Sequence, residues 1–125
     1  LLTDAMPDWG KIFSDEQIDA LIAYMRFLGS AKHELLGDPE HGARLYQKYC
    51  AVCHGAEGYG DGSMTQLIDM EPADHTNSNT MNRLSNEDLI AFIYEGNDEY
   101  MPAWRGILDQ AEVEALVSYI RLLSQ

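Results

Sequence analysis

Apolar residues recur every three or four positions in four stretches of this chain, a spacing that predicts amphipathic helices. The four stretches are residues 14–28, 38–54, 85–96 and 109–124. No segment alternates apolar and polar residues well enough to predict a β-strand. The pattern therefore predicts an all-α protein.

Residues that commonly begin and end helices support three of these assignments. Asp38 is followed by a proline and a glutamate, which is typical of a helix start. Ser85 begins a capping-box sequence, and Gly96 is a suitable end for the same helix. Asp109 and Glu112 open the last helix as Ser85 opens the one before it.

The sequence Cys50-Ala51-Val52-Cys53-His54 carries the most specific chemistry in the chain. Two thiols three positions apart, directly followed by a histidine, are what covalent attachment of a c-type haem requires. A thioredoxin-like redox pair would need a βαβ pattern, and a structural zinc site would need four Cys or His ligands in spaced pairs. Cys50 and Cys53 are the only cysteines, and no strand pattern flanks them. The motif therefore predicts one covalent haem, with His54 on its iron.

Residues 55–84, directly after this motif, are rich in Gly, Asp, Asn, Thr and Pro. Such a composition predicts a loop, here with one short helical turn. A loop of this length is uncommon in a compact domain. A covalently held porphyrin would explain it, because the porphyrin offers an apolar surface on which the loop can pack.

A haem iron that transfers electrons without an open coordination position needs a second axial ligand. Met101 is the strongest candidate, because Pro102 fixes the backbone directly after it and a stiff loop can hold the thioether on the iron. A methionine elsewhere more often fills a core or lies in a loop. A histidine in the polar segment after residue 70 is expected to be exposed. The weaker candidates are Met64, Met70, Met81 and His75.

From about Gly37 to Gln125 the chain resembles a class I cytochrome c. The resemblance rests on the attachment motif, on the Met-Pro-Ala-Trp segment, and on Gly42, Tyr46 and Tyr119 in the first and last helices of this region. It implies helices packed around one covalent haem and joined by long loops. It also implies that the two helices cross closely at Gly42, with the two tyrosines packed together.

The same resemblance implies the roles of the site residues. Cys50 and Cys53 would form the two thioether bonds to haem c, His54 would be the proximal iron ligand and Met101 the distal one. The implied function is electron transfer, so the chain is expected to be an electron carrier and not an enzyme. Two alternatives stay open, namely a relay domain of a larger oxidoreductase and a haem enzyme or gas sensor with a displaceable distal ligand.

The first thirty residues repeat the end of the chain. Met6-Pro7-Asp8-Trp9 matches Met101-Pro102-Ala103-Trp104, 95 positions later, and the similarity continues without a gap through the helix that follows. We interpret the repeat as the tail of a first haem domain, so that the natural protein is a dihaem, two-domain cytochrome c. The expected parts are residues 1–30 (remnant of the preceding domain), 31–37 (linker) and 38–125 (complete monohaem domain).

The helix at residues 14–28 would lack its natural partner helix in this interpretation. Its apolar stripe consists of Ile18, Leu21, Ile22 and Met25. Burying such side chains is worth roughly 1.5–3 kcal/mol each. We therefore expect the stripe to pack on the complete domain or to drive self-association through helix 14–28.

The chain is strongly acidic, with 8 Lys and Arg against 21 Asp and Glu and a formal net charge of −13. This charge argues against binding to nucleic acid and favours redox protein partners with a basic or neutral docking face. No apolar run is long enough to span a bilayer. The resemblance implies a location in the periplasm or on the outer face of the cytoplasmic membrane.

Overall fold

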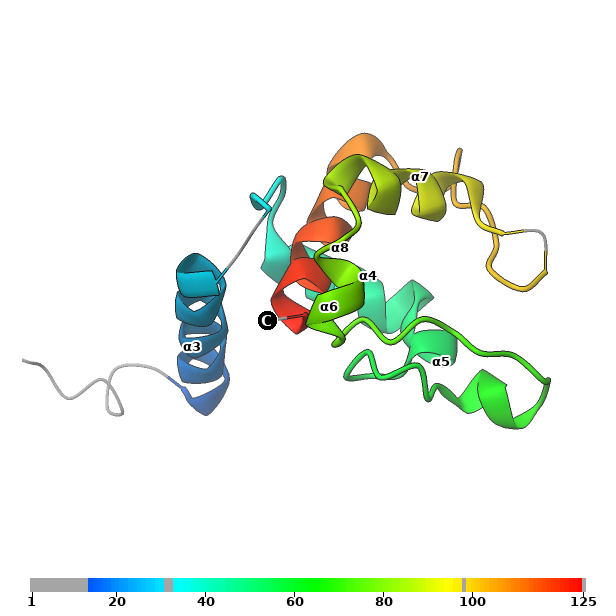
Figure 1. Cartoon of the computed structure of the whole chain (residues 1–125), viewed down its shortest axis with the longest axis horizontal. Coiled ribbons are helices and arrows are strands. Elements are labelled where there is room, and N and C mark those ends of the chain that lie inside the picture. Colours follow the sequence, from blue (N-terminus) through cyan, green and yellow to red (C-terminus); the bar gives the residue numbers. More distant parts are fainter. Residues whose placement is uncertain (1–13, 31–32, 98, 125) are drawn as a thin grey trace, which may run out of the picture.

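The computed structural model describes residues 14–30, 33–97 and 99–124. In this part of the chain the only β feature is an isolated bridge between Arg105 and Leu108. The prediction of an all-α fold is confirmed (Figure 1). The helices are α3 (Asp15–Ser30), α4 (Pro39–Tyr49), α5 (Ala51–His54), the 3-10 helix η1 (Ser63–Gln66), α6 (Ser78–Met81), α7 (Asn86–Glu95) and α8 (Gln110–Leu123).

The predicted helix starts are confirmed in atomic detail. The Asp38 side chain accepts a hydrogen bond from the backbone at the start of α4. Ser85 and Asp88 form a reciprocal capping box at the start of α7, and Asp109 and Glu112 form another at the start of α8. Each box satisfies backbone N–H groups that have no partner inside the helix.

Helices α4 and α8 cross in close contact. A Cβ atom on Gly42 would overlap the backbone carbonyl of Ala115, so the crossing requires glycine at this position. Beside the crossing, the rings of Tyr46 and Tyr119 pack edge to face, with centroids 5.2 Å apart. The expected helix crossing is therefore present.

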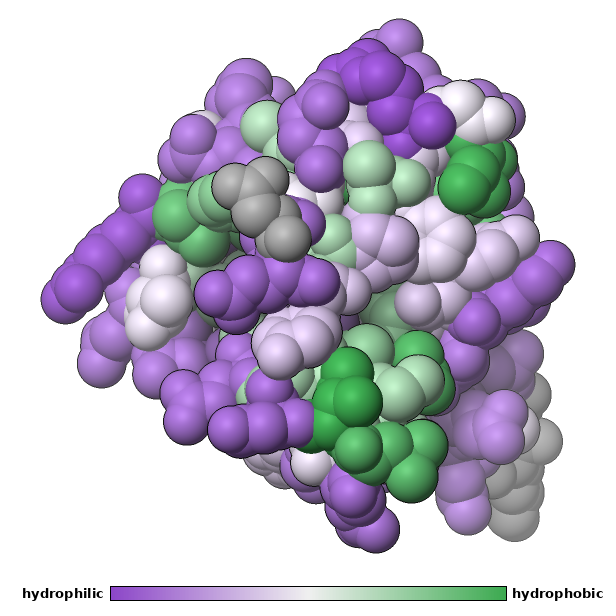
Figure 2. Space-filling model, turned by 90° about the vertical axis from the view of Figure 1, so that its right-hand side faces the viewer, coloured by the Kyte–Doolittle hydropathy of each residue, from purple (hydrophilic) through white to green (hydrophobic). Residues whose placement is uncertain are grey.

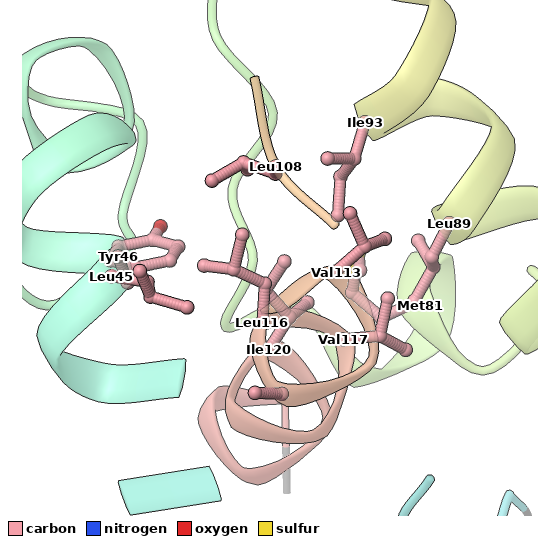
Figure 3. Close-up of a cluster of buried hydrophobic side chains, with 11 residues drawn as sticks. Leu45, Tyr46, Met81, Leu89, Ile93, Leu108, Val113, Leu116, Val117 and Ile120 are labelled. Atoms are coloured by element: carbon pink, nitrogen blue, oxygen red, sulfur yellow. The ribbon is translucent and has the colours of Figure 1, made fainter. Parts of the chain in front are cut away.

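The hydrophobic core lies where α8 meets α4 on one side and α6 and α7 on the other (Figure 3). Leu116 and Val117 of α8 are completely buried at its centre. Arg121 is also buried, and its guanidinium donates to the Asn86 side chain and to the Met81 and Leu84 carbonyls. These bonds fix the end of α8 to the segment that leads into α7.

The long segment between the attachment motif and α7 contains two short helices, η1 and α6. The expectation of one helical turn was wrong. The second turn forms because Asn77 caps it, with the Asn77 Oδ1 accepting a hydrogen bond from the Thr80 N–H at 3.2 Å. Polar loop residues can thus start a helix of a single turn, which is too short to show apolar periodicity.

Helix α3 stands at one side of the domain in Figure 1 and contacts it mainly through α8. The expected helix at 14–28 is therefore present, with its end at Ser30. Leu21 and Ile22 of its apolar stripe are 46% and 41% exposed. The Met6-Pro7-Asp8-Trp9 segment and the side chains of 24–30 lie outside the described part of the chain.

Candidate haem-binding site

The attachment motif begins where α4 ends. The Cys50 N–H still donates to the Tyr46 carbonyl, at 2.8 Å, and the short helix α5 then carries the rest of the motif. This single-turn geometry turns both Cys50 and Cys53 towards the same cavity. Both cysteines are free thiols that are half-buried.

The cavity has a volume of about 490 Å³, well within the size range of small-molecule and cofactor sites. Its lining comes from the attachment motif with the end of α4, from the loop after η1 and from the loop after α7. Tyr49 and Trp104 contribute aromatic surface, with ring centroids 5.0 Å apart. The lining is Tyr49, Cys50, Cys53, His54, Asp69, Met70, Glu71, Pro72, Ala73, Asn97, Glu99, Tyr100, Met101, Pro102 and Trp104.

His54 is held in the form and orientation that a metal ligand needs. Its Nδ1 lies 3.0 Å from the Ala73 carbonyl oxygen. Because a carbonyl oxygen can only accept a hydrogen bond, Nδ1 is the protonated nitrogen and its N–H is the donor. Burial lowers the pKa of His54, which keeps the imidazole neutral. A neutral ring whose Nδ1–H is engaged by a carbonyl leaves Nε2 as the atom able to bind a metal.

His75 is not the exposed loop residue that its polar surroundings predicted. Its ring stacks on the His54 ring, with centroids 4.2 Å apart, and its Nδ1 shares a 2.8 Å hydrogen bond with the Tyr46 hydroxyl. Burial, and then the neighbouring His54, lower the pKa of His75 to about 3. Sequence reasoning missed this contact because the two histidines are 21 positions apart, on either side of a long irregular segment.

The surroundings of the two cysteines distinguish haem attachment from a thioredoxin-like redox pair and from a zinc site. Burial raises the pKa of Cys50 to about 12, whereas reactive thiols of redox pairs and zinc-bound thiols have lowered pKa values. No group of three or more His, Cys, Asp or Glu side chains in the described ranges is arranged to hold a metal ion. Two thiols on one cavity of cofactor size, with His54 beside them, fit attachment of a porphyrin better than either alternative.

The candidate distal ligands differ in whether they line the cavity. Met101 lines the cavity from the loop after α7, whereas His54 lines it from α5. Met70 also lines the cavity, although it lies only three residues from Ala73, on the same loop as the carbonyl that orients His54. Met81 is buried in the core, and Met64 lies on η1. The assignment of the ligands stays a prediction, and the geometry favours Met101.

Two thiols, a neutral imidazole and a thioether on one cavity form a donor set that fits a covalently attached haem. The cavity lies beside a close crossing of the first and last helices of an all-α domain. Together, fold and cavity define the class of this protein as a c-type cytochrome, which is an electron carrier.

Comparison with known families makes the assignment more specific. Residues 37–120 match the family described as "Cytochrome C oxidase, cbb3-type, subunit III". The match covers well over half of the chain, and the chain belongs to this family. Covalently bound haem c is a property that this family membership implies.

Curated relatives are subunits of an oxidase. The "Cbb3-type cytochrome c oxidase subunit FixP" of Bradyrhizobium diazoefficiens is 26% identical over 117 residues, which is 90% of this chain and 37% of that protein. The subunit named CcoP from Azospirillum brasilense is 26% identical over 112 residues, again 90% of this chain and 37% of the relative. The chain thus spans little more than a third of the length of these relatives.

Solved structures confirm the fold. The KustC0563 c-type cytochrome superposes with a TM-score of 0.59 and 28% identity, over 67% of this chain and 98% of that one. A chain of the Kuenenia stuttgartiensis reducing HAO-like protein complex Kustc0457/Kustc0458 superposes with a TM-score of 0.57 and 27% identity, over 67% of this chain and 41% of that one.

Proposed function

We propose that this chain carries one haem c, joined by thioether bonds to Cys50 and Cys53, with His54 and Met101 as axial ligands. The observation that carries the proposal is the arrangement of one cavity. Both thiols, His54 and Met101 line the same cavity, although Met101 comes from the loop after α7 and lies 47 positions beyond His54 in the sequence. When bound, the haem supplies a one-electron iron couple whose potential is raised by a methionine ligand.

The residues of this chain have defined tasks in that function. Ala73 fixes the orientation of His54 through its carbonyl, which limits rearrangement between the two oxidation states. Tyr49, Trp104 and Pro102 give the cavity apolar surface, on which a porphyrin would pack in place of water. The exclusion of water lowers the reorganisation that electron transfer would otherwise require.

The ligand assignment is tested on protein matured together with a haem-ligation system. Mass spectrometry should show one covalent haem adduct per chain, and the ferric protein should show the weak far-red sulfur-to-iron band. Met101→Ala should abolish this band and allow the ferrous protein to bind carbon monoxide. Met70→Ala, in the same cavity, is the matched control and should keep the band. Loss of the band in Met70→Ala alone would overturn the assignment.

We further propose that residues 38–125 are the second haem domain of a dihaem subunit and that residues 1–30 end the first. The repeat at an offset of 95 positions supports this. The match to FixP also supports it, because a match over 90% of the chain must include part of the segment before residue 37. Ser14 and Gln17 also cap α3 as Asp109 and Glu112 cap α8. The sequence upstream of Leu1 tests this directly, since it should encode a second Cys-x-x-Cys-His.

A role as a relay domain in a larger oxidoreductase is the second candidate. It is favoured by the curated relatives, which are named as subunits of an oxidase. c-Type cytochrome domains of this kind typically lie on the outer side of a membrane or in the periplasm, and we propose the periplasmic side for this one. No described helix is long and apolar enough to cross a bilayer. Copurification of the full-length protein with oxidase subunits would favour the relay, and recovery as a free carrier would favour a shuttle.

The partner should have an apolar docking centre and a basic rim. Figure 2 looks onto the end of the molecule with the loop tips and shows a compact apolar patch among mostly hydrophilic side chains. Leu67, directly after η1, is 76% exposed, and Asp69 and Glu71, two and four positions later, line the cavity. Electron transfer to a basic partner cytochrome should therefore slow as ionic strength rises. A rate that is independent of salt would argue against electrostatic docking.

A further inference from the structure

The backbone around Met101 is held by one side chain. The Oδ1 of Asn97 accepts hydrogen bonds from three backbone N–H groups, those of Glu99 at 3.0 Å, Tyr100 at 2.9 Å and Met101 at 3.0 Å. The N–H of Asn97 in turn donates to the Met101 carbonyl, at 3.0 Å. Asn97 therefore fixes the peptide groups on both sides of the Met101 Cα atom.

This arrangement is anchored to helix α7. Gly96 caps the end of the helix with a φ of +65°, which favours glycine. A Cβ there would overlap the Met101 carbonyl and the Pro102 backbone. Farther along, the Trp104 N–H donates to the Ile93 carbonyl at 3.1 Å. Met101 is thus connected to the end of α7 from both directions along the chain.

Asn97 also faces the site itself, because it lines the same cavity as Met101 and His54. Its side-chain oxygen accepts a hydrogen bond from the backbone N–H of Met101, the proposed ligand. A thioether is a weak, neutral ligand that small added molecules can replace. Release of the sulfur is favoured by the conformational entropy that the loop gains when it is freed. A loop that stays fixed gains little, so its methionine is harder to displace.

We propose that Asn97 is a positioning residue that holds the Met101 sulfur at the iron by fixing the Met101 backbone. The proposal deepens the function proposed above and rests on Met101 being the distal ligand. A short side chain with an acceptor oxygen is required, since three N–H groups converge on one atom. Aspartate meets this requirement and alanine does not.

The test compares the haem-loaded Asn97→Ala variant with the wild-type protein. Without the acceptor, three backbone N–H groups lose their protein partner and the loop loosens. The ferric variant should bind added imidazole on the order of tenfold more tightly, because the competing sulfur is held less firmly. Its far-red band should weaken, and peptides containing Tyr100 and Met101 should exchange backbone amide hydrogens faster.

Two further variants separate positioning from simple stabilisation. Asn97→Asp keeps the acceptor and should restore the band and the wild-type imidazole affinity. Asn77→Ala removes a helix cap of the same residue type outside the cavity, and should lower stability while imidazole affinity stays within about twofold of wild type.

The outcomes distinguish this inference from the function on which it rests. If Asn97→Ala keeps the band and the imidazole affinity of the wild type, Asn97 does not position the ligand. The same holds if Asn77→Ala changes both properties as strongly as Asn97→Ala does. If wild-type protein lacks the far-red band, or if Met101→Ala retains it, the ligand assignment itself is wrong.

Discussion

Helices α3 and α8 have nearly the same sequence pattern and very different surroundings. Leu21 of α3 and Leu116 of α8 occupy equivalent positions, 95 residues apart. Leu116 is completely buried between α4 and α7, whereas Leu21 is 46% exposed. The difference shows that an amphipathic pattern specifies which face of a helix can be buried, while burial itself requires a partner surface.

The partner surface of α8 is highly specific. Helix α4 presents Gly42, so that the two backbones approach closely, and Tyr46 then packs against Tyr119. Helix α3 contacts the domain mainly through α8 and leaves Leu21 and Ile22 largely open. The same residue types therefore contribute to the core in one helix and to the surface in the other.

The largest expected difference is between Leu116→Ala and Leu21→Ala. The first leaves a cavity in the core and should lower the free energy of unfolding by about 3–4 kcal/mol. The second removes a side chain that is 46% exposed and should cost about 1 kcal/mol. Denaturant titration of the haem-loaded protein measures both. Equal losses would mean that α3 is packed as firmly as α8.

Removing the partner surface of α8 should have the next largest effect. Gly42→Ala places a methyl group against the Ala115 backbone, and overpacking of this kind should cost about 2–3 kcal/mol. Gly106→Ala is the control, because a Cβ there meets no atom within 4 Å. Its φ of +85° still makes alanine unfavourable by about 1 kcal/mol. Equal effects in the two variants would contradict the close crossing.

The helix caps offer a smaller and more local comparison. Asp109 accepts a hydrogen bond from the Glu112 N–H at 2.8 Å, and Ser14 accepts one from the Gln17 N–H at 3.2 Å. Asp109→Ala should lower global stability by about 1 kcal/mol, since α8 unfolds only with the domain. Ser14→Ala should speed hydrogen exchange in α3 and leave global stability unchanged. A global loss from Ser14→Ala would show that α3 is part of the cooperative unit.

The smallest expected effect is weak self-association through the open face of α3. Leu21 and Ile22 would be buried when two copies meet. Sedimentation equilibrium should show a solution mass that rises with concentration for this chain. Replacing both residues with glutamate, or deleting residues 1–30, should leave a monomer at every concentration. An unchanged mass in these variants would exclude α3 as the contact.

The features that depend on residues close together in the sequence were predictable. The attachment motif lies within five consecutive residues, and the caps at Ser85 and Asp109 act over three positions. The stack of His75 on His54 was not predictable, because a long loop brings the two rings together. The bonds of Asn97 to the Met101 backbone likewise depend on the path of the chain after α7, which no periodicity encodes.

The sequence by itself determined the helices, their apolar faces, their caps and the chemistry of the attachment motif, since each depends on residues a few positions apart. The tertiary structure decided which apolar face is covered, which methionines reach the cavity and what orients His54. These outcomes depend on contacts between distant segments, such as Gly42 with Ala115 and His54 with Ala73. Side-chain spacing gives a helix a face to bury, and the packing of separate segments determines whether that face meets protein or solvent.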